Sequence, residues 1–345
     1  MTAVPQKECA IAIWLLVICA MIFAMVILGG VTRLTHSGLS MVEWRPLFGI
    51  LPPIGEAAWQ RVFEQYQQFP EYQKINFAMT QAEFKRIFLF EYSHRLLGRA
   101  IGVVFAVPFL YFLLRRRISW QLAPRLGVMF VLGALQGLLG WYMVQSGLVD
   151  RPDVSAYRLT AHLGLAVLIY GYIFWSALGL LAPRRQPEAG TGGWRLGRIG
   201  APVLTALIFL TLLSGGFVAG NDAGLAYNSF PLMDGRFVPA DIFRLEPWWR
   251  NFFENLPLVQ LDHRLLALLT VFATLALWLA GLRAALGVGA RRAFNAWAAM
   301  VLVQLGLGIA TLLLFVPVPL GAAHQAGALL TFSAALWCSH ALARG

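Results

Sequence analysis

The sequence predicts an all-α integral membrane protein. Its eight transmembrane helices are expected to form two four-helix bundles, related as parallel repeats, with the N and C termini in the cytoplasm. Three observations support this prediction. Of 345 residues, 59% are hydrophobic and only 12% are charged, about half the charged fraction of a soluble domain. The apolar residues fall in continuous runs of roughly 20, the length of a membrane-spanning helix. Motifs of the first half recur in the second.

Each expected span is a run of apolar residues without the alternation of a barrel strand. Since a helix satisfies its own backbone hydrogen bonds in lipid, helices are predicted. The first run follows Lys7 and lacks a small-x-small cleavage site, so we interpret it as a retained span. The eight spans are residues 10–30, 88–114, 123–147, 158–182, 197–220, 257–282, 292–315 and 320–342.

The basic residues explain the net charge of +11 and predict the orientation. "RRRISWQLAPR" joins the second and third spans, and "PRRQPEAGTGGWRLGR" joins the fourth and fifth. These loops lie on one side, which the positive-inside rule assigns to the cytoplasm. The loop at 32–87 is then external. We therefore expect no nucleic-acid partner, and a multi-pass protein of the bacterial inner membrane.

The three cysteines are Cys9, Cys19 and Cys338, all in or beside predicted spans. Because none lies in an external loop, we expect buried thiols and no structural disulfide.

Four pairs of motifs show that the chain is an internal duplication. "GGVTRLTHSGLS" from Gly29 matches "GGFVAGNDAGLA" from Gly215, an offset of 186 residues. "FEYSHRLLGR" matches "VQLDHRLLAL" at an offset of 169, "QGLLG" matches "QLGLG" at 168, and "LTAHLGLAVL" matches "GAAHQAGALL" at 162. Because four spans return a chain to its starting side, the copies are parallel. The predicted organisation is a first half at 1–183, a linker at 184–198 and a second half at 199–345.

The duplication places two histidines in each half, His94 and His162 in the first and His263 and His324 in the second. Polar residues at this depth are candidates for function. Two imidazoles inside an apolar four-helix bundle suit axial ligation of a heme iron, whereas a structural zinc site needs four ligands.

Charged residues beside these histidines are further candidates. Arg95 and Arg264 directly follow His94 and His263, where each either pairs with a heme propionate or anchors its helix at the interface. Glu91 lies one helical turn before His94, and the equivalent residue is Gln260. Such a difference suggests catalysis in the first half only, with Glu91 as acid or base. The alternative is that Glu91 is an ion-pair partner of Arg95 or Arg99.

"GGVTRLTHSGLSMVEWRPLFGILPP", "FEYSHRLLGR" and the four duplicated histidines resemble the heme A synthase family over nearly the whole chain. The resemblance implies an enzyme that oxidises a ring methyl of heme O to the formyl group of heme A, for aa3-type terminal oxidases. It implies that His94 and His162 hold the substrate heme, that His263 and His324 ligate a heme b, and that Glu91 is the essential carboxylate.

The resemblance also implies partners and marks one departure. Heme O synthase and cytochrome oxidase assembly factors are the expected partners, and the electron donor is left open. Gram-positive members carry a cysteine pair in an external loop, which this chain lacks. The resemblance is therefore closer to the proteobacterial and mitochondrial branch of the family than to the Gram-positive branch.

The long loop at 32–87 mixes aromatic and charged residues, so short surface helices that cover the first site are expected. Within it, His36 either helps to close the site and shuttle protons or is a surface residue. Arg99 binds a propionate, pairs with a carboxylate or snorkels to the interface. His340 is interpreted as structural.

Two other classes of protein fit less well. A di-heme membrane cytochrome that takes electrons from quinol would place hemes near both faces, whereas all four histidines are predicted toward the external face. A transporter with parallel repeats would be expected to have broken helices, or a carboxylate in each half.

Overall fold

The computed structural model describes residues 6–43, 50–149, 152–181 and 194–344. These residues form helices and no strand. In chain order the elements are α1 (Gln6–Leu34), α2 (Glu56–Tyr66), α3 (Pro70–Lys74), α4 (Gln81–Leu114), α5 (Ala123–Gln145), α6 (Ala156–Leu181), α7 (Arg195–Gly220), η1 (Ala223–Leu225), η2 (Trp248–Arg250), α8 (Asn251–Glu254), α9 (Leu256–Leu282), α10 (Val288–Leu313) and α11 (Val318–Ala343).

Eight of these helices are long and apolar enough to cross a membrane, which confirms the predicted number of spans. They are α1, α4, α5, α6, α7, α9, α10 and α11. Only α4 begins far from its predicted first residue, at Gln81 rather than near residue 88. A capping box explains this early start. The Glu83 amide donates to the Thr80 hydroxyl, and the Glu83 carboxylate accepts from the Thr80 amide at 2.8 Å, so a polar first turn precedes the apolar run.

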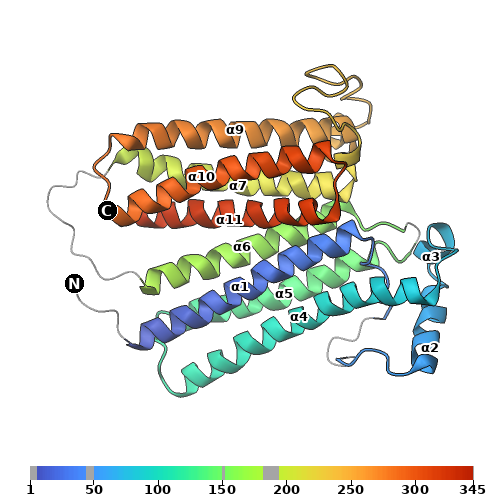
Figure 1. Cartoon of the computed structure of the whole chain (residues 1–345). Coiled ribbons are helices and arrows are strands. Elements are labelled where there is room, and N and C mark those ends of the chain that lie inside the picture. The colour runs from blue at the N-terminus through green and yellow to red at the C-terminus, as the bar shows by residue number, and fades with distance from the viewer. Residues whose placement is uncertain (1–5, 44–49, 150–151, 182–193, 345) are drawn as a thin grey trace.

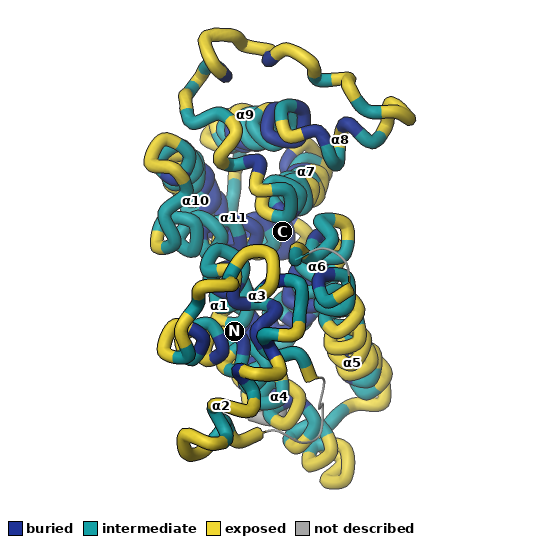
Figure 2. The backbone as a smooth tube through the Cα atoms, turned by 90° about the vertical axis from the view of Figure 1, so that its right-hand side faces the viewer, coloured by how far each residue is buried: buried dark blue, intermediate teal, exposed yellow. Residues whose placement is uncertain are grey.

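The long helices pack in two groups, as Figures 1 and 2 show. In the first group α1 packs against α4 and α6, and α5 packs against the same two helices. In the second group α7 and α10 each pack against α9 and α11. The described start of α1 and the end of α11 lie at one end of the molecule, and α2 and α3 lie at the opposite end (Figure 1). Residues 184–193 of the predicted linker lie outside the described residues, and α7 begins two residues later, at Arg195.

The second glycine of each duplicated pair lies between the two groups. A Cβ at Gly30 of α1 would overlap the Gln325 side chain of α11, whose amide donates to the Val26 carbonyl at 2.9 Å. A Cβ at Gly216 of α7 would come within 2.9 Å of the Thr160 hydroxyl of α6. Glycine at these positions therefore lets the two groups approach closely.

The first loop contains the two short helices that its composition predicts, α2 and α3. They are held to the start of α4 by a cluster of buried aromatic residues, Phe63, Tyr66, Phe84 and Phe88. Next to this cluster the Tyr66 hydroxyl donates to the carboxylate of Glu71 at 3.0 Å and accepts from the Asn76 amide at 2.8 Å. The described part of the loop is therefore a packed structure with its own small core.

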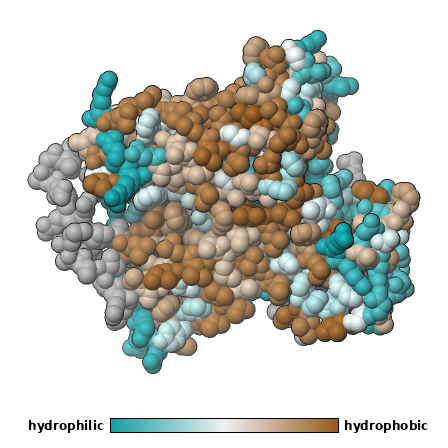
Figure 3. Space-filling view, viewed as in Figure 1, coloured by the Kyte–Doolittle hydropathy of each residue, from teal (hydrophilic) through white to brown (hydrophobic). Residues whose placement is uncertain are grey.

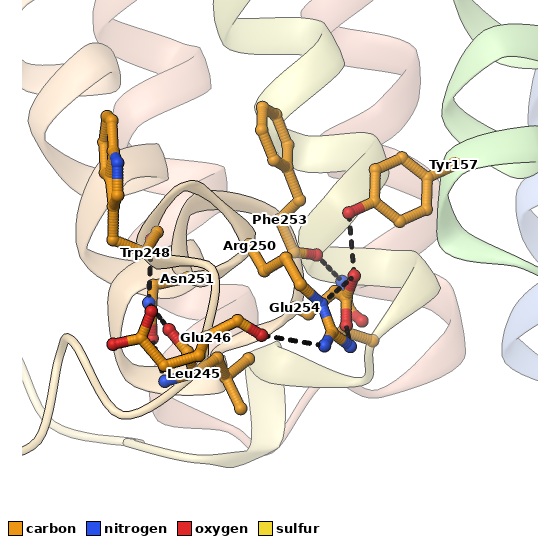
Figure 4. A network of polar contacts seen from close by, with 9 residues as sticks. Tyr157, Leu245, Glu246, Trp248, Arg250, Asn251, Phe253 and Glu254 are labelled. Atoms are coloured by element: carbon orange, nitrogen blue, oxygen red, sulfur yellow. Dashed lines mark hydrogen bonds and ion pairs between the residues drawn. The ribbon is translucent and has the colours of Figure 1, made fainter.

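The loop between α7 and α9, residues 221–255, is joined to the first group by the polar contacts of Figure 4. Glu254 of α8 pairs with Arg250 at 2.5 Å and accepts at 2.9 Å from the hydroxyl of Tyr157, at the start of α6. Asn251 donates to the carbonyl of Leu245 at 2.8 Å and accepts from its amide at 2.9 Å. These contacts give the segment before α9 a defined path.

The surface matches a membrane protein. On the face that Figure 3 shows, hydrophobic residues cover the middle and hydrophilic residues gather toward the two ends. Many large apolar side chains on the outer faces of the helices are exposed, among them Val107, Leu138, Phe272 and Leu302. All three cysteines are free; Cys19 and Cys338 are buried as expected, whereas Cys9 is only half-buried.

Candidate functional site

In the first group, both predicted histidines lie with their rings against a glycine of a neighbouring helix. His94 is on α4, and a Cβ at Gly29 of α1 would lie 3.1 Å from its Cε1 atom. His162 is on α6, and a Cβ at Gly140 of α5 would lie 2.8 Å from its Cε1 atom. Any larger side chain at these glycines would push the imidazole aside. Both histidines are half-buried.

The second group repeats this arrangement. The ring of His263 on α9 lies against Gly215 of α7, and the ring of His324 on α11 lies against Gly308 of α10. The two ring centroids are 6.4 Å apart, and the ring planes are nearly perpendicular, at 88°. This separation leaves room for a metal ion between the rings, since an imidazole nitrogen binds a metal at about 2.0–2.1 Å. Among the described residues, no three or more His, Cys, Asp or Glu side chains form a metal-binding group.

Glutamines hold the histidines of α6 and α11 in the same way. The amide nitrogen of Gln136 lies 3.1 Å from Nδ1 of His162 and donates to its backbone carbonyl at 2.9 Å. Gln304 makes the same two contacts with His324, also at 3.1 and 2.9 Å. These glutamines begin the duplicated motifs "QGLLG" and "QLGLG". Their sequence match identified the repeat but predicted no role for the glutamines. In the structure, each glutamine contacts the ring and the backbone of a histidine.

Glu91 is buried, with only 3% of its surface exposed, and three donors surround its carboxylate. Oε2 accepts from the Ser40 hydroxyl and from the Met41 amide, each at 2.7 Å, and Oε1 pairs with Arg95 at 2.5 Å. Arg95 also donates to the backbone carbonyls of Met41 at 2.8 Å and Glu43 at 2.9 Å. The ion-pair interpretation of Glu91 therefore describes its geometry, and together Glu91 and Arg95 hold the first loop on α4. We call this set of contacts the loop clamp.

A second loop clamp occupies the equivalent place on α9. Gln260 and Arg264 donate to the carbonyl of Tyr227 at 3.1 and 2.9 Å. Tyr227 is 186 residues after Met41, the same offset as the duplicated glycines. At that offset, Ser40 corresponds to Ala226. The first clamp thus combines a serine with a carboxylate, where the second has an alanine and an amide. Sequence reasoning missed Ser40, although the last letters of the matched "GLS" and "GLA" contain the signal.

A cavity of about 320 Å³ adjoins the first clamp, between the first loop and α4. Arg99 lines it together with Arg61 and Arg95, against one carboxylate, Glu43, so the cavity wall is basic on balance. His36 does not reach this place. It is exposed, and its Nδ1 lies 3.5 Å from a guanidinium nitrogen of Arg33. His340, which we interpreted as structural, is buried edge-on against the ring of Trp175.

Comparison with known proteins places the chain in a family. The model of the cytochrome oxidase assembly protein family COX15-CtaA matches residues 12–336. The heme A synthase of Nitrosospira multiformis is 56% identical over 99% of this chain and 98% of its own length. That of Nitrosomonas eutropha is 53% identical over 96% and 93%, and heme A synthase COX15 of Arabidopsis thaliana is 44% identical over 99% and 77%. The predicted resemblance is confirmed, and the chain belongs to the COX15-CtaA family of cytochrome oxidase assembly proteins.

Proposed function

We propose that this chain is a heme A synthase, a multi-pass enzyme of the bacterial inner membrane that oxidises a ring methyl of heme O to the formyl group of heme A. The observation that carries the proposal is the duplicated histidine pair with a glutamate three residues before the first histidine in one copy, Glu91, and an amide at the same position in the other, Gln260. Relatives named heme A synthase match the chain over nearly its full length. The proposed oxidation is the reaction for which these relatives are named, and the arrangement of the two halves supports it.

The first half, residues 1–183, binds the substrate heme O through His94 and His162. Their fit to a flat macrocycle rests on two features. Each ring lies against a glycine backbone, at Gly29 and Gly140, so little side-chain volume stands beside the imidazoles. The first loop, held by the clamp, covers this end of α4 and limits the access of water. Arg95 borders the basic cavity, which favours the propionate carboxylates.

The second half, residues 199–345, holds a heme b through His263 and His324. The separation of 6.4 Å between the two ring centroids leaves room for an iron ion between two imidazole ligands. Arg264 adds a further match, because its Nε atom is buried and has no hydrogen-bond partner among the described residues. A propionate supplies the acceptor that such a donor needs. A heme b bound there would supply one-electron transfer for the reaction in the first half.

Glu91 is the proposed catalytic carboxylate. It takes up or releases a proton at Oε2, where the Ser40 hydroxyl lies 2.7 Å away. Arg95 acts as a positioning residue, because it fixes Oε1 and the adjacent loop at the same time. Heme O synthase is the proposed source of substrate, and cytochrome oxidase assembly factors are the proposed recipients of the product.

The test of this function is the substitution Glu91→Gln. The second clamp shows that an amide at this place is compatible with a held loop, since Gln260 bonds to Tyr227. The variant should therefore fold and retain heme. Heme A formation should fall roughly 10²–10⁴-fold, because general acid–base groups contribute that much to rate. The measurement is heme extraction and chromatography from cells that make heme O and express the variant.

The matched control is Glu64→Gln, the same change at an exposed carboxylate of α2 in the same loop that does not line the cavity, which should leave heme A formation unchanged. Wild-type heme A levels in Glu91→Gln would reduce Glu91 to an ion-pair partner. If the unmodified protein forms no heme A and contains only b-type heme, the chain is a cytochrome and the proposed function is wrong.

A further inference from the structure

His94 and His263 occupy matching places but differ in one hydrogen bond. Both rings lie against the first glycine of their pair, where an added Cβ would come within 3.1 Å of the imidazole at Gly29 and 3.2 Å at Gly215. The residue before that glycine is Leu28 in the first half and Ser214 in the second. Only Ser214 offers a hydroxyl to the neighbouring imidazole.

The contacts of Ser214 determine which nitrogen of His263 carries its proton. The Ser214 hydroxyl oxygen lies 2.8 Å from the carbonyl oxygen of Thr211 and 2.8 Å from Nδ1 of His263. A hydroxyl has one proton, and a carbonyl can only accept. The hydroxyl therefore donates to Thr211 and accepts from Nδ1–H of His263. This tautomer leaves the lone pair on Nε2, the atom then available to bind iron.

His94 lacks an equivalent contact. Its Nδ1 atom is buried and has no hydrogen-bond partner in the part of the chain that the structure describes. The other histidine of each half does not add to the difference, because Gln136 holds His162 with the same distances as Gln304 holds His324. Apart from a 3.4 Å approach of the Gln136 amide nitrogen to Nε2 of His162, the two histidine pairs thus differ at the Nδ1 contact of His263.

We infer that Ser214 is a positioning residue that makes the heme of the second half resident, and that Leu28 leaves the heme of the first half exchangeable. The inference rests on the proposed function, in which one half must release its heme as product and the other must keep it. When one imidazole nitrogen binds a metal, a hydrogen bond from the other nitrogen fixes the orientation of the histidine and raises its basicity. Removal of such a partner typically lowers metal affinity 10–100-fold.

The experiment compares heme release from Ser214→Ala, Ser214→Thr and unmodified protein, purified with heme bound. Transfer of heme to an excess of apomyoglobin gives the dissociation rate of each site without reference to activity. Ser214→Ala should release the second-half heme roughly 10–100-fold faster. Ser214→Thr keeps the hydroxyl and should restore slow release. The control Thr331→Val removes a buried hydroxyl of α11 whose one hydrogen bond within the described residues is to the Gly327 carbonyl, and it should release heme at the unmodified rate.

A reciprocal variant tests the other half of the inference. In Leu28→Ser the new hydroxyl stands one turn after the Met25 carbonyl, as Ser214 does after Thr211, and heme release from the first half should slow. The midpoint potential of the second-half heme should rise in Ser214→Ala, since a less basic imidazole stabilises the ferric state less. Equal release rates and potentials in Ser214→Ala and Thr331→Val would overturn the inference. Failure of the proposed function has a different signature, in which His263→Ala and His324→Ala retain all b-type heme.

Discussion

Gly306 and Gly308 lie two residues apart on α10, but only Gly308 faces an imidazole. A Cβ at Gly308 would lie 2.9 Å from Cε1 of His324, whereas a Cβ at Gly306 meets nothing within 4 Å. Alanine is favoured over glycine inside a helix by about 0.5–1 kcal/mol, so both alanine variants should fold. Gly308→Ala should displace the His324 ring and weaken heme binding roughly tenfold or more. Gly306→Ala should bind heme normally.

The heme-to-protein ratio and the bis-imidazole absorption spectrum of the two purified variants measure this effect. Equal heme contents would show that the close approach of Gly308 does not position the ligand. The comparison is direct because the two variants share the added methyl group, the helix and the depth.

Sequence reasoning found the four histidines because a histidine is rare in an apolar span and each is duplicated. Ser40 and Ser214 were missed for a physical reason. A serine in a helix or turn commonly bonds to its own backbone, so its presence in a sequence does not indicate a side-chain partner. The contacts of Arg95 with the loop depend on the path of residues 41–43, which no spacing rule determines. The matched segments end at the pair Ser40 and Ala226, and one more residue before their first glycines would have added the pair Leu28 and Ser214.

At the scale of elements, the apolar runs predicted seven of the long helices closely and missed the start of α4. Hydropathy locates the part of a helix that lies in lipid. The first turns of α4 are polar and depend on the Thr80–Glu83 capping box and on packing of Phe84 and Phe88 against α2. The same aromatic residues explain why α2 and α3 have defined positions. A composition rich in aromatics predicted short helices there but not their docking.

The packed first loop contains a carboxyl group that should make its stability depend on pH. Burial raises the pKa of Glu71 from its ordinary 4.5 to about 7, the charges of Glu91 and Asp153 act in the same direction, and the Tyr66 hydroxyl opposes them. The folded loop then binds more protons than the unfolded loop between these pH values. Stability is therefore full below about pH 4.5 and falls as pH rises through about 7. At about 1.4 kcal/mol per pKa unit the loss is on the order of 3 kcal/mol.

Hydrogen exchange of the α2 and α3 amides, corrected for intrinsic pH dependence, measures this loss. Glu71→Gln keeps an acceptor for Tyr66 and should remove the pH dependence of protection. Glu64→Gln, at an exposed carboxylate of α2, should preserve it. A loop whose protection is the same at about pH 5 and about pH 8 in the unmodified protein would contradict the prediction.

For the whole molecule, the duplicated motifs predicted the division of the helices into two groups but not how the groups meet. The second glycines, Gly30 and Gly216, face different residues, Gln325 and Thr160, so the repeat provides no rule for the interface. A polar contact at one end adds to it. Arg33 at the end of α1 pairs with Asp222 at 2.9 Å and donates to the Ala219 carbonyl at 3.1 Å. Such contacts follow from tertiary packing and leave no periodic trace in the sequence.

The orientation of the molecule follows from charge and is the last prediction. The turn between α4 and α5 carries Arg115, Arg116 and Arg117 at one end of the bundle, and α2 and α3 lie at the other. Since basic loops are retained in the cytoplasm, Ser119 should face inward and Gln68 outward. Both residues are exposed, so a cysteine placed at either should react where a reagent can reach it.

In spheroplasts, a membrane-impermeant maleimide should label Gln68→Cys directly and Ser119→Cys only after the membrane is permeabilised. The unmodified protein gives the background, which should be low because Cys19 and Cys338 are buried and Cys9 is half-buried. The labels report opposite ends of one continuous bundle, so they must reverse together if the orientation is inverted. Labelling of Ser119→Cys from outside, with Gln68→Cys protected, would place the proposed substrate site on the cytoplasmic side. Heme A would then form on the cytoplasmic side. The basic loops, at the opposite end of the bundle, would lie outside the cell, contrary to the positive-inside rule.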